Sequence, residues 1–177
     1  MNYVGKHTIL KSVSIEDAAD ICALRNKPSN NKYLSSSNPI TLEQQEAWIK
    51  KYLLEPDGVY FLITDNLLTP VGTISLYNQV NGCAEFGRYI CENPLQAIEA
   101  EFLLLKYAFE ELNLNKIYCK TVRENQKVWK QHSRFGFIEK GLETDTRIDK
   151  EVVIQSINKE QFQSFDYSQI TKLLNRF

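Results

Sequence analysis

Apolar residues in this chain follow two periods, one typical of strands and one typical of helices. The runs at 59–64, 70–80 and 84–91 are short and rich in β-branched and aromatic residues, as strands are. Asn81-Gly82 between the last two is a strong hairpin signal. Further strands are predicted at 7–13, at 116–122, from the segment GFIEKG onward and at 151–157.

Helical periods fall between these strands. Ser14 with Asp17 and Thr41 with Gln44 have the three-residue spacing of helix-opening caps. The predicted helices cover about 15–25, a stretch after Thr41 that carries Trp48, about 97–112, and 125–135. Residues 26–40, rich in Asn, Ser and Pro, predict a loop, and the tail DYSQITKLLNRF predicts a short terminal helix.

The element order is β-α-α-β-β-β-α-β-α-β-β. The central hairpins require antiparallel pairing, whereas the strand–helix–strand passage from 84 to 122 requires a crossover and a parallel pair. We therefore expect an α/β fold with a mixed sheet of about six to seven strands and helices on both faces. Repeats and linkers are lacking in the sequence, so a single domain over 1–177 is expected.

Composition narrows the function. The 177 residues are 43% hydrophobic and 24% charged, as in a soluble globular protein, and a net charge of -1 argues against a nucleic-acid binder. Four cysteines form no CxxC pair and there are only two histidines, so neither a metal site nor a disulfide framework is expected. The N-terminus lacks the apolar core of a signal peptide, and no membrane span is expected, which favours a cytoplasmic location.

Several strings carry a family resemblance. AEFGRYI, YAFEELNLNKIYCKTVREN and ENQKVWKQHSRFGFIEKG, together with the element order, resemble the GNAT acyltransferase fold over roughly residues 7–158. The resemblance implies an N-acetyltransferase that moves an acetyl group from acetyl-CoA to an amine, without a metal. It also implies that the family's fourth and fifth strands splay apart, so that backbone groups of Tyr89, Ile90 and Cys91 pair with the pantetheine arm. The alternative is an ordinary buried strand.

The loop after this strand departs from the family. GNATs hold the pyrophosphate of CoA in a glycine-rich turn at a helix N-terminus, whereas residues 92–101 read ENPLQAIEAE, with no glycine. Gln96 and Ala97 are the best equivalents, helped by Lys127 or Lys130. Glutamates at 92, 99 and 101 could repel a diphosphate, and the alternative is a weak or lost affinity for the cofactor.

The resemblance also suggests catalytic residues. His132 stands seven residues after Asn125, where many GNATs place a tyrosine near the CoA sulfur, and it can donate a proton. The alternative is a structural histidine on an apolar stripe with Val128. Asn125 resembles a pantetheine contact and is also a plausible helix cap. Glu85 is the candidate general base, or a strand-end charge facing water.

The acceptor site is expected between the first two helices and their loop, with Arg25, Asn26, Tyr33 and Trp48 as candidates. LRNKPSNNKYL and ITLEQQEAWI resemble GNATs that acetylate nucleotide-linked amino sugars, including the pseudaminic acid type. The expected partner is thus a small-molecule amine, and the protein a monomer or homodimer. Ribosomal-protein N-terminal acetyltransferases share the helix layout. A degenerate GNAT that binds without turnover is the alternative of another class.

Overall fold

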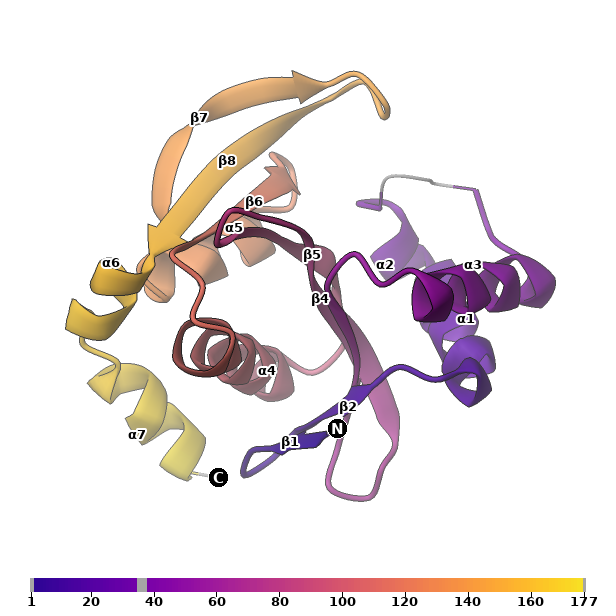
Figure 1. Cartoon of the computed structure of the whole chain (residues 1–177), viewed down its shortest axis with the longest axis horizontal. Helices are drawn as coiled ribbons and strands as arrows, with labels where there is room; N and C mark the ends of the chain where they lie inside the picture. Colours follow the sequence, from indigo (N-terminus) through magenta and orange to yellow (C-terminus); the bar gives the residue numbers. More distant parts are fainter. Residues whose placement is uncertain (1, 35–37, 177) are drawn as a thin grey trace.

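The computed structural model describes residues 2–34 and 38–176. One mixed sheet runs through the molecule in the spatial order β1-β2-β3-β4-β5-β6-β8-β7 (Figure 1). Its strands are β1 (Asn2–Val4), β2 (Ile9–Ser12), β3 (Val59–Thr64), β4 (Pro70–Val80), β5 (Cys83–Cys91), β6 (Lys116–Val122), β7 (Ile138–Asp145) and β8 (Lys150–Asn158). The predicted α/β fold is confirmed, but the strand number was too low, because the three-residue β1 was missed.

The helices agree with the predicted positions, with additions at both ends. They are α1 (Ala18–Asn26), α2 (Pro28–Asn31), α3 (Leu42–Leu54), α4 (Pro94–Lys106), α5 (Gln126–Arg134), α6 (Lys159–Ser164) and α7 (Ser168–Arg176). A 3-10 turn precedes α1 and a π-helical turn, Tyr107–Glu111, ends α4. Both predicted caps are present as capping boxes. The prediction of a loop over 26–40 is wrong at α2. This helix begins at Pro28, a residue suited to the first helical turn.

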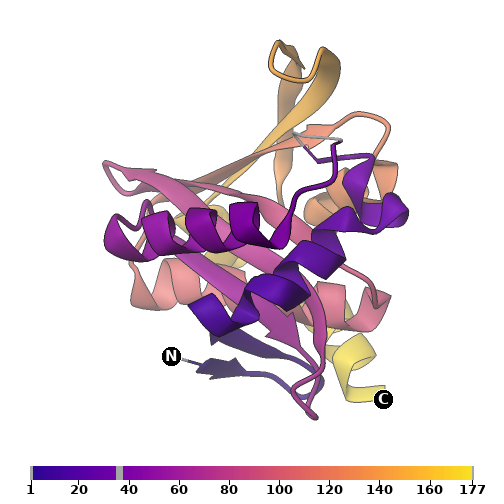
Figure 2. The same cartoon turned by 90° about the vertical axis from the view of Figure 1, so that its right-hand side faces the viewer.

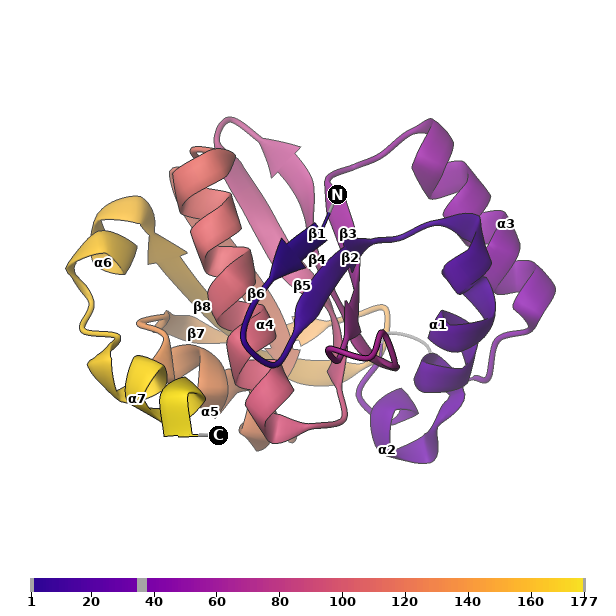
Figure 3. The same cartoon turned by 90° about the horizontal axis from the view of Figure 1, so that it is seen from below.

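Helices cover both faces of the sheet (Figure 3). On one face lie α1 and α3, which Figure 2 shows running across the strands. Side chains of β3 alternate between two cores: Leu62 packs with Ile21 and Ile49 beneath these helices, whereas Phe61 belongs to the larger core. That larger core lies on the other face, under α4. Within the described residues, no helix is long and apolar enough to cross a membrane.

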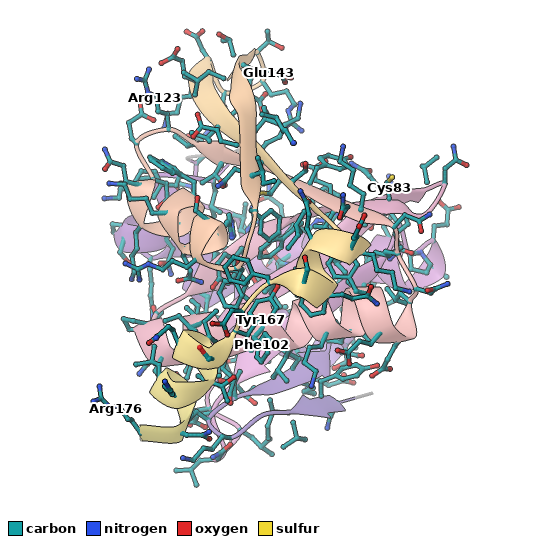
Figure 4. The ribbon with its side chains drawn as sticks, turned by 90° about the vertical axis from the view of Figure 1, so that its left-hand side faces the viewer. Cys83, Phe102, Arg123, Glu143, Tyr167 and Arg176 are labelled. Carbon is teal, nitrogen blue, oxygen red and sulfur yellow. The ribbon has the colours of Figure 1, made fainter. Side chains whose placement is uncertain are left out.

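The C-terminal helices pack on the outside of α4. Figure 4 shows Phe102 of α4 and Tyr167 near the start of α7 lying against one another, with ring centroids 5.1 Å apart. Phe109 and Phe162 stack in the same layer at 5.0 Å. The tail therefore closes the core on the side of α4 that faces away from the sheet.

The centre of the sheet combines antiparallel pairing of β4 with β5 and parallel pairing of β5 with β6. The turn between β4 and β5 places Asn81 and Gly82 at φ 51° and 73°, the left-handed conformation of a tight hairpin. The next strand, β6, runs parallel to β5, but the pairing extends only from Cys83↔Lys116 to Phe86↔Cys119. Both strands continue beyond that point without pairing with each other, which leaves an opening in the sheet.

Candidate active site

A β-bulge accompanies the separation of β5 from β6. On β4, Ser75 pairs with Gly87 and Thr73 with Ile90, so two residues of β5 oppose one of β4. Arg88 occupies the bulge at φ 48°. Beyond it, Ile90 and Cys91 still pair with β4, while β6 pairs with β8 as far as Val122. The edge of β5 that faces β6 is consequently left without a strand over Tyr89–Cys91.

Two adjoining cavities occupy this opening. The first, about 420 Å³, lies at the end of β5 and is called here the strand-end cavity; the second, about 300 Å³, is called the charged cavity. The residues lining both cavities, and so marking their junction, are Tyr33, Leu34, Tyr89, Asn125 and Val128.

The strand-end cavity contains most of the residues predicted to hold the cofactor. Tyr89, Ile90, Cys91, Ala97 and Asn125 all line it. Asn125 stands at the N-cap position of α5, but its side chain makes no capping hydrogen bond, so this amide is not used to cap the helix. Burial raises the pKa of the Cys91 thiol to about 12, which keeps it protonated at neutral pH.

The start of α4 differs from what the sequence led us to expect. Asn93 Oδ1 accepts hydrogen bonds from the backbone N–H groups of Leu95 and Gln96, at 2.9 and 3.3 Å, and Ala97 N–H donates to the Asn93 carbonyl at 2.9 Å. Pro94 has no N–H. The free donors expected at Gln96 and Ala97 are therefore already engaged within the chain. The Gln96 side chain also turns away and donates to the His7 carbonyl.

The charges expected around the pyrophosphate also lie differently. Lys127 lines the strand-end cavity, whereas Lys130 donates to Gln126 and is not among the lining residues. Of the three glutamates, Glu92 pairs with Lys27 at 2.7 Å. Glu99 accepts the backbone N–H groups of Lys6 and His7, and Glu101 points into the core. The expected repulsion by unpaired carboxylates is therefore absent at these three positions.

The charged cavity is lined mainly by ionisable side chains. Its ionisable members are Arg25, Tyr33, Tyr77, Glu85, Arg88, Tyr89, Lys120, His132, Asp145 and Arg147. Glu85 accepts hydrogen bonds from Tyr77 Oη at 2.9 Å and from the Asn78 amide at 3.0 Å. Burial, followed by the nearby Glu85 charge, raises the pKa of Tyr77 well above its usual value. Glu85 is thus a held carboxylate that faces the cavity and not merely a strand-end charge.

Two of the acceptor candidates take structural positions. Asn26 makes two hydrogen bonds to the backbone of Ile40, which ties α1 to the entry of α3, and it lines neither cavity. Trp48 likewise lies outside both. The guanidinium of Arg88 lies over the Trp48 ring at 5.0 Å and over Tyr77 at 4.2 Å, and it pairs with Asp57 at 2.8 Å. Arg88, which the sequence did not single out, lines the charged cavity together with Tyr77.

His132 lies on the wall of the charged cavity, 2% exposed. Its ring packs against Phe86, with centroids 4.8 Å apart, and its Nδ1 is 2.7 Å from the Glu101 carboxylate. Gln131 joins the same carboxylate and also donates to Tyr89 Oη. Glu101 and Gln131 were not predicted. A glutamate on the buried face of α4 was the available signal, since such a residue needs a partner.

The fold is a mixed α/β sheet with a cleft where two parallel strands, β5 and β6, separate. The family model described as "Acetyltransferase (GNAT) domain" matches residues 7–138. This chain therefore belongs to the GNAT family and is an acetyl-CoA-dependent N-acetyltransferase.

Individual relatives agree with this assignment. The chain is 30% identical over 146 residues to an uncharacterized N-acetyltransferase p20 of Bacillus licheniformis, covering 77% of this chain and 82% of that one. It is 27% identical over 115 residues to acetyltransferase PseH of Campylobacter jejuni, covering 64% and 71%.

Solved structures share the fold. The apo structure of FdhC, a nucleotide-linked sugar GNAT, superimposes with a TM-score of 0.78 at 24% identity, covering 98% of each chain. Spermidine N-acetyltransferase from Vibrio cholerae, in complex with CoA and spermine, gives a TM-score of 0.79 at 22% identity, covering 90% of this chain and 100% of that one.

Proposed function

We propose that this protein acetylates the amino group of a small molecule that also carries negative charge, and that a nucleotide-linked amino sugar is the acceptor class. The observation that carries the proposal is a cationic side chain of the charged cavity, Arg25, for which the described part of the chain offers no ion-pair partner. Three of its basic side chains are already paired: Arg88 with Asp57, Lys120 with Glu143, and Arg147 with Asp145.

Arg25 differs from these three. Within residues 2–34 and 38–176 its buried Nε has no hydrogen-bond partner, and no ion pair involves its guanidinium. A buried guanidinium N–H without a partner is costly, and phosphate or carboxylate oxygens match its planar fork. An acceptor bearing such a group would satisfy Arg25 in the cavity where its amine has to react.

The charges of this cavity also disfavour the alternative, positively charged acceptors. A polyamine or a basic N-terminal peptide would bring positive charge beside Arg25, and such acceptors favour an acidic cleft. The two carboxylates that line the cavity, Glu85 and Asp145, are already held, by Tyr77 with Asn78 and by Arg147 respectively. The likenesses to FdhC and to the spermidine enzyme, at 24% and 22% identity, are both to the fold alone, so the proposal rests on the charges of the cavity.

The chain's own groups suit direct transfer. When bound, acetyl-CoA supplies a thioester that an amine can attack. The open edge of β5 over Tyr89–Cys91 can pair with the amides of an extended arm, as an added strand would. Asn125, at the junction of the cavities, can orient that arm. Because the Cys91 thiol stays protonated, it is a poor nucleophile, and a covalent acetyl-cysteine is disfavoured.

Cofactor binding requires one local change. A pyrophosphate at the start of α4 would take over the N–H groups of Leu95 and Gln96 that Asn93 now occupies, with Lys127 nearby as a counter-charge. The residues present therefore fit acetyl-CoA, in competition with an internal cap. Inside the cleft, His132 is our candidate for proton transfer, because it adjoins the junction, whereas Glu85 lies where β5 and β6 are still paired.

Release of free thiol from acetyl-CoA should be followed with a UDP-linked amino sugar, spermidine and a basic N-terminal peptide as acceptors. We expect the highest kcat/KM with the nucleotide-linked sugar. Losing a charge-assisted hydrogen bond of about 1.5–3 kcal/mol predicts that Arg25→Gln raises the KM of that acceptor about 10- to 100-fold.

The control is Arg123→Gln, which removes an exposed arginine whose partner is Glu151 and which lines neither cavity. It should leave the acceptor KM unchanged. A preference for spermidine that survives in Arg25→Gln would contradict the proposed acceptor class.

A further inference from the structure

Two glutamates are buried on α4, and they have different partners. Glu99 is 4% exposed and accepts two backbone N–H groups of the β1–β2 turn, each at 2.7 Å, which is a structural use. Glu101 is fully buried and contacts two side chains of α5 at 2.7 Å each: Gln131 Nε2 donates to its carboxylate, and His132 Nδ1 lies within hydrogen-bond distance of it. Only the second carboxylate is connected to the cleft.

The hydrogen bonds around Glu101 form one continuous network. Gln131 Nε2 donates to both Glu101 Oε2 and Tyr89 Oη, and Tyr89 Oη donates to the carbonyl of Ala97 at 2.9 Å. Burial, with the Glu101 charge second, raises the pKa of Tyr89 well above its usual value, so this hydroxyl remains a donor. The network joins α4, α5 and β5 and fixes the orientation of the His132 ring.

Stability alone does not account for this pair. Removing a carboxylate and an imidazole from water costs several kcal/mol, and an apolar pair of similar volume is often equally stable. The imidazole of His132 lies between Phe86 and Phe137, with centroids 4.8 and 5.3 Å away, where an apolar side chain would pack well. The retained polarity indicates a use for the histidine at the cavity wall.

We propose that Glu101 is a positioning residue that holds the proton of His132 on Nδ1, so that Nε2 faces the charged cavity and carries the amine proton to the departing sulfur. Since Nδ1 is directed at Glu101, Nε2 is the nitrogen left toward the cavity, and within the described residues it has no hydrogen-bond partner. A carboxylate that fixes an imidazole tautomer and balances the imidazolium is established catalytic chemistry.

In the acetyl-transfer step, a single proton carrier accounts for every proton that moves. The amine nitrogen forms a bond to the acetyl carbon, the bond from that carbon to sulfur breaks, and its electron pair stays on sulfur. His132 Nε2 takes the proton that nitrogen loses and returns it to sulfur, so neither a net proton nor another reactant is required. This inference rests on acetyl transfer in this cleft and is independent of the acceptor class.

The charged and titratable groups around His132 come from several elements. Glu101 approaches from α4 and Tyr89 from β5, with ring centroids 6.1 Å apart for Tyr89 and His132. The other ionisable groups that line the charged cavity are Arg25, Tyr33, Tyr77, Glu85, Arg88, Lys120, Asp145 and Arg147. Glu101 is the only one of these that contacts the imidazole through a hydrogen bond among the described residues.

The tautomer can be observed without an acceptor. The chain has only two histidines, so ¹⁵N-histidine NMR gives two ring systems, and His7→Gln assigns them. We expect neutral His132 to be protonated on Nδ1 in the wild type, and Glu101→Leu to shift it toward the Nε2-protonated form. A wild-type ring protonated on Nε2 would overturn the proposal, whatever the acceptor is.

The second test measures steady-state kinetics with any amine that proves to be a substrate. General acid–base catalysis typically contributes about 10²–10⁴-fold, so His132→Gln should lower kcat at least about 10²-fold with little change in the KM for acetyl-CoA. Glu101→Gln, which keeps the shape, should lower kcat about 10-fold or more and move the lower limb of the pH profile.

Glu99→Gln is the matched control, a neighbouring buried glutamate on the same helix. It should lower the melting temperature and leave the pH profile unchanged. If Glu101→Gln behaves like Glu99→Gln, the carboxylate is structural and the inference fails, even if the acceptor is the one proposed.

Discussion

The two cavities of the cleft meet at Tyr89 and Asn125, yet they are built from different groups. The strand-end cavity contains the open edge of β5 at Tyr89–Cys91 and reaches α4 at Ala97. The charged cavity is lined mainly by ionisable side chains, with Glu85 held by its neighbours and Arg25 lacking an ion-pair partner in residues 2–34 and 38–176. Backbone recognition depends little on residue identity, so the first cavity suits a cofactor common to a family and the second an acceptor particular to this enzyme.

The largest effect is expected from a substitution that disturbs the backbone of the strand-end cavity alone. It tests whether that cavity binds the cofactor. Gly72 of β4 pairs with Cys91, and a Cβ at this position would overlap the Ile90 carbonyl. Gly72→Ala should push the end of β5 out of place and cost about 1–3 kcal/mol of unfolding free energy. We expect acetyl-CoA binding, measured by calorimetry, to weaken at least about 10-fold. Unchanged binding would show that the edge of β5 does not hold the cofactor.

A second substitution should increase the affinity for CoA at the start of α4. Asn93→Gly removes the internal acceptor for the N–H groups of Leu95 and Gln96, and a glycine cap costs only a few tenths of a kcal/mol. In this variant CoA no longer has to break the two hydrogen bonds to Asn93 Oδ1 before it binds. Its affinity should therefore rise about 10-fold. Asn158→Gly, which removes the comparable cap of α6 away from the cleft, is the control. Equal or weaker binding by Asn93→Gly would argue that the pyrophosphate does not reach α4.

The smallest effect is expected at Cys91. Because burial raises the pKa of this thiol to about 12, it stays protonated from about pH 7 to about pH 9, whereas an unperturbed thiol near 8.5 ionises over that range. Alkylation of Cys91 should therefore not accelerate over that interval, as mass spectrometry can follow. Cys91→Ala should keep kcat within about threefold of wild type, as should Cys83→Ala, its control at the other end of β5. A loss of about 10²-fold in Cys91→Ala alone would point to a covalent route.

Local signals explain how much of the fold could be predicted. The β4–β5 hairpin follows from Asn81-Gly82, and α3 follows from its capping box at Thr41. By contrast, β1 has only three residues and α2 only four, too few for a period to develop, and both depend on tertiary contacts.

The site was predicted in part, for a physical reason. Residues on regular elements, such as Ile90 and His132, were assigned to the site by resemblance to the family, and they line the two cavities. The network of Glu101, Gln131 and Tyr89 brings together residues up to 42 positions apart, which no local spacing encodes. The cap that Asn93 forms on α4 was not predicted, and its competition with a ligand became apparent only from the hydrogen bonds.

The bulge at Arg88 has a consequence for how such a site can arise. In a regular strand, residues three apart point to opposite faces, yet Phe86 and Tyr89 contact each other at 5.4 Å and both lie against His132. The single extra residue reverses the alternation, so the rings around the histidine depend on the length of β5 more than on its composition. Deleting one residue at this point would restore the regular alternation of β5 and turn one of the two rings away from His132.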